Sequence, residues 1–282
     1  MVDLNLPWTA WRPLKGSAAE RGFPDQPGLY RVRRAGQPQL DYVGQTGRPV
    51  RRRLADLRGV YAAEMPFRDP HTAAPGLWAL VQQGAALEVS VAGVPGDDPT
   101  RKAVEAAVIS LHRAAFGCSP TVNFGRMPAG YAMSTDRRRG VRGGLCADPL
   151  RCHLLGLPLA GPLNTYGAED WGGHAWSAWQ PLANVQTAVP AGVSGLYLIR
   201  RGAELLYVGQ GLLRSRLGAH HRKPVSQAQG RLFQAPGVEQ AFAVLPGVAS
   251  HQLQELENDL IASFFLCTGR VPAAQFLGDR DA

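Results

Sequence analysis

The sequence predicts a mixed α/β fold of the α+β type, made of two tandem small domains, each with a three-stranded, mainly antiparallel sheet flanked by helices. The first observation is a repeat, because WTAWRPL at residues 8–14 returns as WSAWQPL at residues 176–182. The second is that each motif is followed by a Gly-Leu-Tyr segment and then by a Tyr-Val-Gly segment. Such self-similarity indicates a duplicated structural unit. We therefore expect domains at residues 1–127 and 176–282, joined by a connector at residues 128–175.

The first copy is expected to contain a β-hairpin, a basic helix, a third strand and a longer helix. Residues 28–58 hold two apolar segments around a turn, and then an arginine-rich segment after Pro49, a residue favoured in the first turn of a helix. Residues 87–91 alternate between apolar and polar side chains, as a strand does. Residues 99–115 have helical periodicity, with one expected face made of Val104, Val108, Leu111 and Ala115.

The second copy repeats these elements. We expect a hairpin at residues 195–209, a helix from about Leu213, a strand near residues 241–245 and a helix at residues 250–265. The paired tryptophans are interpreted as structural, because both copies carry them. Residues 124–175 are rich in Gly, Pro and Arg, and resemble a connector or extended arm more than a third domain.

Composition limits the class of protein. With 45% hydrophobic and 18% charged residues over 282 positions, the chain has enough apolar material for two cores and is not expected to be disordered. No segment approaches the roughly 20 apolar residues of a membrane span, and the first residues do not resemble a secretion signal. We expect a cytoplasmic protein without a membrane partner. The oligomeric state stays open, and the repeat is compatible with a monomer that contains an internal pseudo-dimer.

The four cysteines do not form a recognisable framework. No Cys-x-x-Cys pair is present, so reduced structural thiols are the favoured interpretation. A zinc site at Cys146, Cys152 and His153 is an alternative, although the spacing matches no standard site and no fourth ligand is evident.

The charge distribution favours a nucleic-acid partner. The net charge is +8, and residues 1–141 hold 19 Lys and Arg against 12 Asp and Glu. Clustered basic residues supply most of the attraction between proteins and phosphate backbones. Candidate phosphate contacts are Arg51, Arg52, Arg137, Arg138, Arg139 and Arg142. A solvated surface is the alternative explanation for each of them.

Five motif positions of the first copy occur in an order known from a nuclease family. Gly28-Leu29-Tyr30, Tyr42-Val43-Gly44 and Arg53 together resemble the signature of the GIY-YIG nuclease superfamily. That family also has a Glu in a later helix, followed by an Asn. Glu105, in Val-Glu-Ala-Ala-Val-Ile, and Asn123, in Pro-Thr-Val-Asn, resemble these two positions. The resemblance implies hydrolysis of phosphodiester bonds.

The resemblance also implies a role for each residue. Glu105 would bind Mg²⁺ or Mn²⁺, which would stabilise the leaving oxygen. Arg53 would hold the non-bridging oxygens with its planar fork. Tyr30 is favoured as the base with Tyr42 as support, although a phenol needs a nearby cation to become a useful base at neutral pH. Asn123 would be an orienting hydrogen-bond donor.

The family often carries a His four residues after the Arg. The first copy has Leu57 there, so His71 is a candidate for that group from a loop. The second copy offers Tyr197, Tyr207, Arg216, His220 and Glu257, with Glu257 as its metal ligand. It lacks the Asn and has only Gln275 at the corresponding place. We favour an active first copy and leave the activity of the second open.

The sequence leaves two classes of function open, a nuclease and a nucleic-acid-binding protein. The favoured one is a metal-dependent DNA endonuclease in repair, recombination or restriction. The alternatives are a non-catalytic nucleic-acid-binding protein built on a nuclease fold, and an RNA-cleaving nuclease. Each motif taken singly has a structural explanation, since paired tyrosines stabilise hairpins and glycines serve turns. The joint order of the motif positions favours a nuclease-type site.

Overall fold

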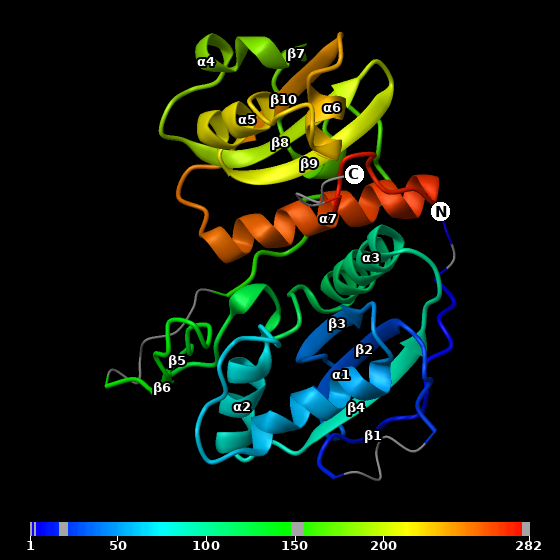
Figure 1. Cartoon of the computed structure of the whole chain (residues 1–282), viewed down its shortest axis with the longest axis vertical. Helices are drawn as coiled ribbons and strands as arrows, with labels where there is room; N and C mark the ends of the chain where they lie inside the picture. The colour runs from blue at the N-terminus through cyan, green and yellow to red at the C-terminus, as the bar shows by residue number, and fades with distance from the viewer. Residues whose placement is uncertain (1, 3, 17–21, 148–154, 278–282) are drawn as a thin grey trace. The chain divides into compact units, whose positions relative to one another are not determined.

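The computed structural model covers the whole chain and describes residues 2, 4–16, 22–147 and 155–277 (Figure 1). The fold is mixed α/β and its sheets are antiparallel. Two compact units are present. The amino-terminal unit contains residues 4–97 and 111–156, and the carboxy-terminal unit contains residues 1–3, 98–110 and 157–282. Residues 98–110, which we predicted as part of the first domain, therefore belong to the carboxy-terminal unit.

The amino-terminal unit is built on a four-stranded sheet with the strand order β1-β4-β2-β3. Helices α1 and α2 lie on one face of this sheet (Figure 1). The strands are β1 (Arg12–Pro13), β2 (Gly28–Arg34), β3 (Tyr42–Thr46) and β4 (Leu87–Gly93). The remaining elements are α1 (Val50–Leu57), η2 (Arg58–Tyr61), α2 (Ala74–Gln82), η3 (Asn123–Gly125), β5 (Tyr131–Ala132) and β6 (Gly144–Leu145).

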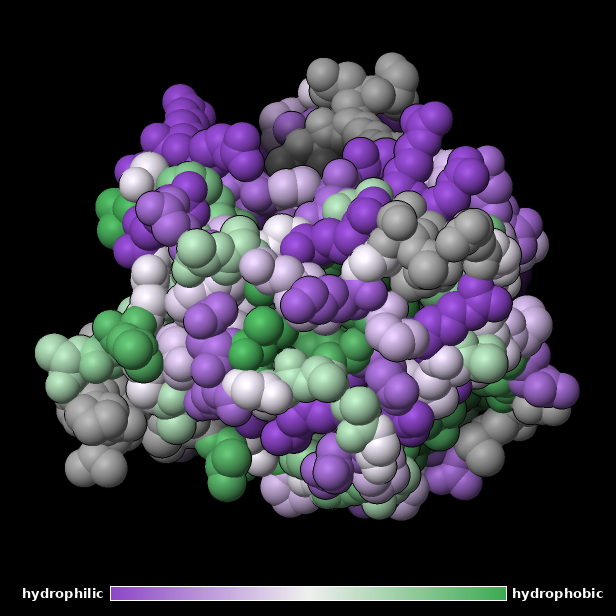
Figure 2. Space-filling view, turned by 90° about the horizontal axis from the view of Figure 1, so that it is seen from below, coloured by the Kyte–Doolittle hydropathy of each residue, from purple (hydrophilic) through white to green (hydrophobic). Residues whose placement is uncertain are grey.

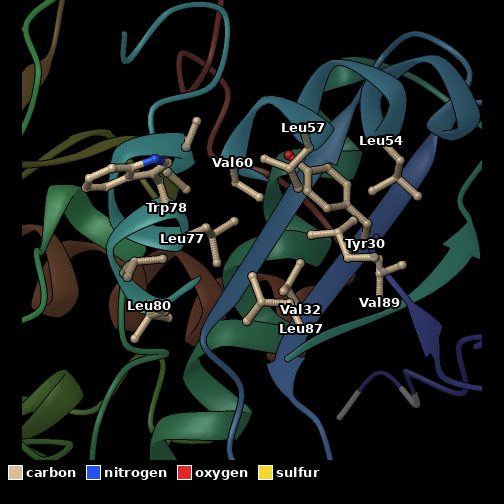
Figure 3. Packing of buried hydrophobic residues seen from close by; sticks show 14 of the residues in the cluster. Tyr30, Val32, Leu54, Leu57, Val60, Leu77, Trp78, Leu80, Leu87 and Val89 are labelled. Atoms are coloured by element: carbon tan, nitrogen blue, oxygen red, sulfur yellow. The ribbon is translucent and has the colours of Figure 1, made fainter. Parts of the chain in front are cut away.

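Strand alternation decides which side chains of β2 reach the core. Tyr30 and Val32 are fully buried in the cluster under α1 and α2. Figure 3 shows the Tyr30 ring beside Leu54 and Leu57 of α1. Successive residues of a strand point to opposite faces, so Arg31 lies on the other side of the sheet. Tyr30 is thus a core residue as well as a candidate site residue.

The carboxy-terminal unit has a four-stranded sheet with the corresponding order β7-β10-β8-β9. Its strands are β7 (Gln180–Pro181), β8 (Ser194–Arg201), β9 (Glu204–Leu212) and β10 (Val238–Val244). Both α5 and α7 contact β8 and β9. The other elements are η4 (Trp171–Gly173), η5 (Leu182–Asn184), α4 (Val185–Ala188), α5 (Leu213–His221), α6 (Ala228–Phe233) and α7 (Ser250–Thr268).

Each sheet has one strand more than the three that the sequence predicts. The added strands, β1 and β7, belong to the tryptophan motifs. The Thr9 amide donates to the Val91 carbonyl, and the Ser177 amide donates to the Phe242 carbonyl, each at 2.8 Å. In this way β1 pairs with β4 and β7 pairs with β10. Without them, β4 and β10 would be sheet edges with unpaired backbone groups.

Helix α3 (Asp98–Phe116) buries only part of the predicted face, since Val104 is buried and Val108 is half-buried. Leu111 and Ala115 are exposed, whereas Ala106 and Ser110 are buried. Ser110 Oγ donates to Asp259 Oδ1 at 2.7 Å and accepts from Asn258 Nδ2 at 2.9 Å. These hydrogen bonds to α7 place the small residues of α3 against its neighbour. Apolar periodicity alone does not reveal such polar contacts between helices.

The predicted connector is folded where the structure describes it. Strands β5 and β6 pair within the amino-terminal unit. In the carboxy-terminal unit, Trp171 Nε1 donates to Ser263 Oγ at 2.8 Å, and the rings of Tyr166 and Phe264 lie 4.8 Å apart. Residues 157–175 thus pack on α7 instead of forming an extended arm. Cys118, Cys146 and Cys267 are free thiols, while Cys152 and His153, the other members of the zinc alternative, lie outside the described residues.

Within the described ranges, no helix has both the length and the apolar character needed to cross a membrane. On the face of the molecule shown in Figure 2, hydrophilic residues are spread around smaller hydrophobic groups.

Candidate active site

The glycines of the two signature segments are required by close packing. A Cβ on Gly44 would lie 2.6 Å from the Tyr30 hydroxyl, and a Cβ on Gly209 would overlap the Tyr197 hydroxyl. Similarly, a Cβ on Gly195 would overlap the backbone of Ala243. The Gly of Tyr-Val-Gly therefore leaves room for the phenol of the neighbouring strand. This explains the residue types of the motif without reference to catalysis.

In the carboxy-terminal unit, two tyrosines meet a histidine. Tyr197 of β8 and Tyr207 of β9 are stacked, with ring centroids 6.1 Å apart. His220 of α5 lies 2.9 Å from the Tyr197 hydroxyl through its Nε2 atom, and 4.7 Å from Tyr207 between ring centroids. Phe233 of α6 packs on the His220 ring at 4.9 Å. We did not predict Phe233, since no sequence pattern pointed to it.

Arg216 lies one helical turn before His220 and completes this group. Its side chain hydrogen bonds with Tyr197. Because a guanidinium can only donate, the Tyr197 oxygen accepts from Arg216, and its O–H is left to donate to Nε2 of His220. Burial, with a contribution from the Arg216 charge, lowers the pKa of His220 to about 4. His220 is therefore neutral at pH 7 and carries its proton on Nδ1.

Glu257 of α7 belongs to the same electrostatic group. Desolvation raises its pKa to about 7, against the opposing attraction of Arg216. Desolvation also raises the pKa of Tyr207 to about 12, with a further contribution from the Glu257 charge. Desolvation also strongly raises the pKa of Tyr197. At neutral pH both phenols keep their protons, while Glu257 is close to its midpoint.

Exposure orders these groups from the surface inwards. Arg216 is exposed, Tyr207 and Glu257 are half-buried, and Tyr197 and His220 are buried. A ligand from solvent would meet the first three side chains. Arg216 and Tyr207 can donate hydrogen bonds to an anion, and the carboxylate of Glu257 can bind a cation.

The residues fit one mode of metal binding. No cluster of three or more His, Cys, Asp or Glu side chains that could enclose a metal ion occurs in the described part of the chain. Mg²⁺ is commonly held by one or two carboxylates together with water and substrate phosphates. The single carboxylate Glu257 fits that mode, and a bound cation would favour its charged form. A metal cage made of protein ligands alone does not fit these residues.

The amino-terminal unit brings together a similar but not identical group. The rings of Tyr30 and Tyr42 lie 5.8 Å apart. His71 Nε2 lies 3.0 Å from the Arg53 carbonyl and its Nδ1 lies 3.5 Å from the Tyr30 hydroxyl. Since a carbonyl only accepts, Nε2 carries the proton and Nδ1 faces the phenol. Burial, supported by the Arg53 charge, lowers the pKa of His71 to about 4.

His71 thus reaches the first tyrosine from a loop, as His220 reaches Tyr197 from a helix. Arg53, however, is engaged with that loop, since its Nη1 donates to the Pro70 carbonyl at 2.8 Å. Glu105 lies in residues 98–110, which belong to the carboxy-terminal unit. The phenols, Arg53 and His71 lie in the amino-terminal unit.

Asn123 contacts backbone. Its Oδ1 accepts from the Val43 amide and its Nδ2 donates to the Val43 carbonyl, both at 2.9 Å. In the second copy, Gln275 Oε1 accepts from the Val208 amide at 3.0 Å. Each of these two side chains holds the strand at the residue that follows a tyrosine, Tyr42 or Tyr207. Gln275 thus makes in the carboxy-terminal unit one of the contacts that Asn123 makes in the amino-terminal unit, and we describe both as positioning residues.

The predicted phosphate contacts lie on the surface of the amino-terminal unit. Arg51 pairs with Asp25 at 3.0 Å, and Arg52 is exposed. Arg137, Arg138, Arg139 and Arg142 are exposed on the turn between β5 and β6. Two of them, Arg137 and Arg142, line a pocket of about 450 Å³ that also includes His71. The arginine turn and His71 therefore border the same pocket.

Comparisons of the chain with protein-family models, with curated proteins and with solved structures found no match.

Proposed function

We propose that the protein is a metal-dependent endonuclease that hydrolyses phosphodiester bonds in DNA, with its catalytic centre in the carboxy-terminal unit. One observation carries the proposal. Tyr197, Tyr207, Arg216, His220 and Glu257 interact with one another within a single compact unit. This moves our preference from the first copy to the second.

The arrangement suits the demands of the reaction. A phosphodiester resists hydrolysis because its oxygens repel a nucleophile and its leaving alkoxide is poor, so charge must be neutralised. Arg216 is exposed and can hold the non-bridging oxygens. Glu257 would hold a divalent cation together with phosphate oxygens. When bound, that cation supplies further neutralisation of the developing charge.

The two phenols have different positions and therefore different proposed roles. Tyr207 is half-buried and accessible to water, so we assign to it the orientation of the attacking water. Tyr197 is fully buried and hydrogen bonded to both Arg216 and His220. Tyr197 fixes the Arg216 side chain, and neutral His220 accepts the Tyr197 proton in a hydrogen bond. This reverses the order of roles that the resemblance favoured.

We infer further that the two units are copies of one domain and that the amino-terminal copy contributes DNA binding. The support is the corresponding strand order, the matching Asn123 and Gln275 contacts, and the excess of arginine in residues 1–141. In that copy Arg53 already donates to Pro70.

Cleavage assays with active-site variants test this proposal. The purified full chain is incubated with supercoiled plasmid and with labelled duplex, single-stranded, flap and RNA substrates, with Mg²⁺, Mn²⁺ or chelator. We expect metal-dependent cutting that Glu257→Gln and Arg216→Ala reduce by at least about 100-fold. Glu105→Gln is the matched control and should keep its activity.

The outcomes separate the alternatives. Cutting that survives Glu257→Gln but is lost in Glu105→Gln would contradict the choice of centre. Metal-independent cutting would contradict the proposed role of Glu257. Binding of DNA without cleavage under every metal condition would favour the second candidate, a non-catalytic nucleic-acid-binding protein. Preferential cutting of RNA would contradict DNA as the substrate.

A further inference from the structure

The carboxy-terminal unit contains an aromatic pocket of about 560 Å³ that the proposed catalytic centre does not use. Its walls include Trp176 and Trp179 of the tryptophan motif, Leu198 of β8, and Tyr166 from the segment that packs on α7. Leu198 follows Tyr197 in the strand, so the two side chains point to opposite faces of the sheet. The pocket therefore lies on the face away from Tyr197.

The amino-terminal unit shows what fills the equivalent space. There the guanidinium of Arg31 lies 4.3 Å from the ring centre of Trp8 and 4.7 Å from that of Trp11. Arg31 follows Tyr30 in β2 just as Leu198 follows Tyr197 in β8. One arginine side chain thus contacts both indoles of the motif. Such contacts between a guanidinium and an aromatic ring are attractive.

The outer side of this position is alike in both copies. Arg33 lies 4.0 Å over Trp11 and pairs with Glu88 at 3.1 Å. Arg200 lies 3.9 Å over Trp179 and pairs with Glu239 at 2.9 Å. The second copy therefore keeps both indoles and the outer ion pair. What it lacks is a guanidinium at this position, because Leu198 is shorter and carries no charge. Trp176 stacks instead on Trp171, with ring centroids 6.4 Å apart.

We propose that this pocket binds the guanidinium group of an arginine side chain presented by a partner polypeptide. The ligand replaces the contact that Arg31 makes within the other copy. The positive charge of Arg200 is paired with Glu239, and Glu169 adds an exposed carboxylate to the pocket wall. The volume exceeds that of a guanidinium group, so the aliphatic stem of the arginine also fits. This inference does not depend on the nuclease proposal.

Titration with short peptides tests the inference. N-acetyl-Gly-Arg-Gly-amide is titrated into the full chain and followed by tryptophan fluorescence and by calorimetry. The matched ligand contains citrulline, which has a similar shape but no charge. We expect the arginine peptide to bind one site per chain, with the citrulline peptide at least about tenfold weaker because cation–π attraction is lost.

Variants locate the site. Leu198→Arg places in the pocket the side chain that Arg31 supplies in the other copy, so it should abolish binding and keep the fold. Leu198→Met leaves the pocket uncharged and should keep binding. Glu169→Gln, an exposed position that does not endanger folding, should weaken binding severalfold.

Three results would overturn the inference. The first is equal affinity for the arginine and citrulline peptides. The second is unchanged affinity in both Leu198→Arg and Glu169→Gln. The third is that a dinucleotide binds and the arginine peptide does not, and that Leu198→Arg removes the dinucleotide binding. This result would assign the pocket to a nucleobase.

Discussion

Replacing Glu257 by Gln should stabilise the protein at high pH. Desolvation raises the Glu257 pKa from an ordinary 4.5 to about 7, so the folded state holds this carboxyl in its neutral form more strongly than the unfolded state does. The stabilisation from the protonated form is present below pH 4.5 and is lost as the pH rises to 7. Gln is neutral throughout and keeps the packing.

The size of the effect follows from the two pKa values. At about 1.4 kcal/mol per pH unit, the interval from 4.5 to about 7 corresponds to about 3 kcal/mol. The free energy of unfolding of Glu257→Gln, measured relative to the wild type, should therefore rise by about 3 kcal/mol between pH 4 and pH 8. Other titrating groups are common to both proteins and cancel in this difference, provided their interaction with Glu257 is small.

Urea unfolding at pH 4, 5, 6, 7 and 8 measures this difference. Chelator is present throughout, because a bound cation would stabilise the folded wild type. Glu204→Gln is the control, since Glu204 is exposed and pairs with Arg201 at 3.0 Å. It should change stability by less than about 1 kcal/mol. If the stability difference between Glu257→Gln and the wild type does not vary with pH, the reasoning that ionisation of Glu257 destabilises the folded state is refuted.

Three further predictions concern other residues of the two sites. Gly44→Ala should destabilise the protein by about 1–3 kcal/mol in urea unfolding, because its Cβ would lie 2.6 Å from the Tyr30 hydroxyl, whereas Gly59→Ala, with open space around it, should not. Asn123→Ala should cost about 2 kcal/mol in the same assay by removing two hydrogen bonds to Val43, and a neutral result would show that water replaces them. Cleavage at limiting metal should increase as the pH rises towards 7, since Glu257 must lose its proton to bind a cation, and a rate that falls over this interval would contradict the assignment.

Local sequence patterns predicted the elements that neighbouring residues encode. Both hairpins follow from alternating apolar residues around turns. The tryptophan motifs also predicted two packed lead-ins, and the structure confirms contacts such as Arg200 over Trp179. The fourth strand of each sheet was not predicted, because two residues are too few to show a period.

Contacts between distant residues were only partly predictable. His71 was named as a candidate for the histidine of the family, supplied from a loop, but its place beside Tyr30 depends on the path of that loop. The partners of Asn123 and Gln275 were not predicted, because they are backbone groups far away in sequence. The face of α3 was predicted only in part for a related reason, since Val104 is buried but Leu111 is exposed and Ser110 contacts α7.

By itself, the sequence determined that one motif set occurs twice and which residue types each copy carries. Only the tertiary structure decided which of those side chains meet, which are buried and therefore have shifted pKa values, and that Leu198 lines a pocket together with Trp176 and Trp179. The physical reason is that periodicity and turn chemistry act between neighbours in the chain, whereas desolvation and close packing depend on groups that only folding brings together.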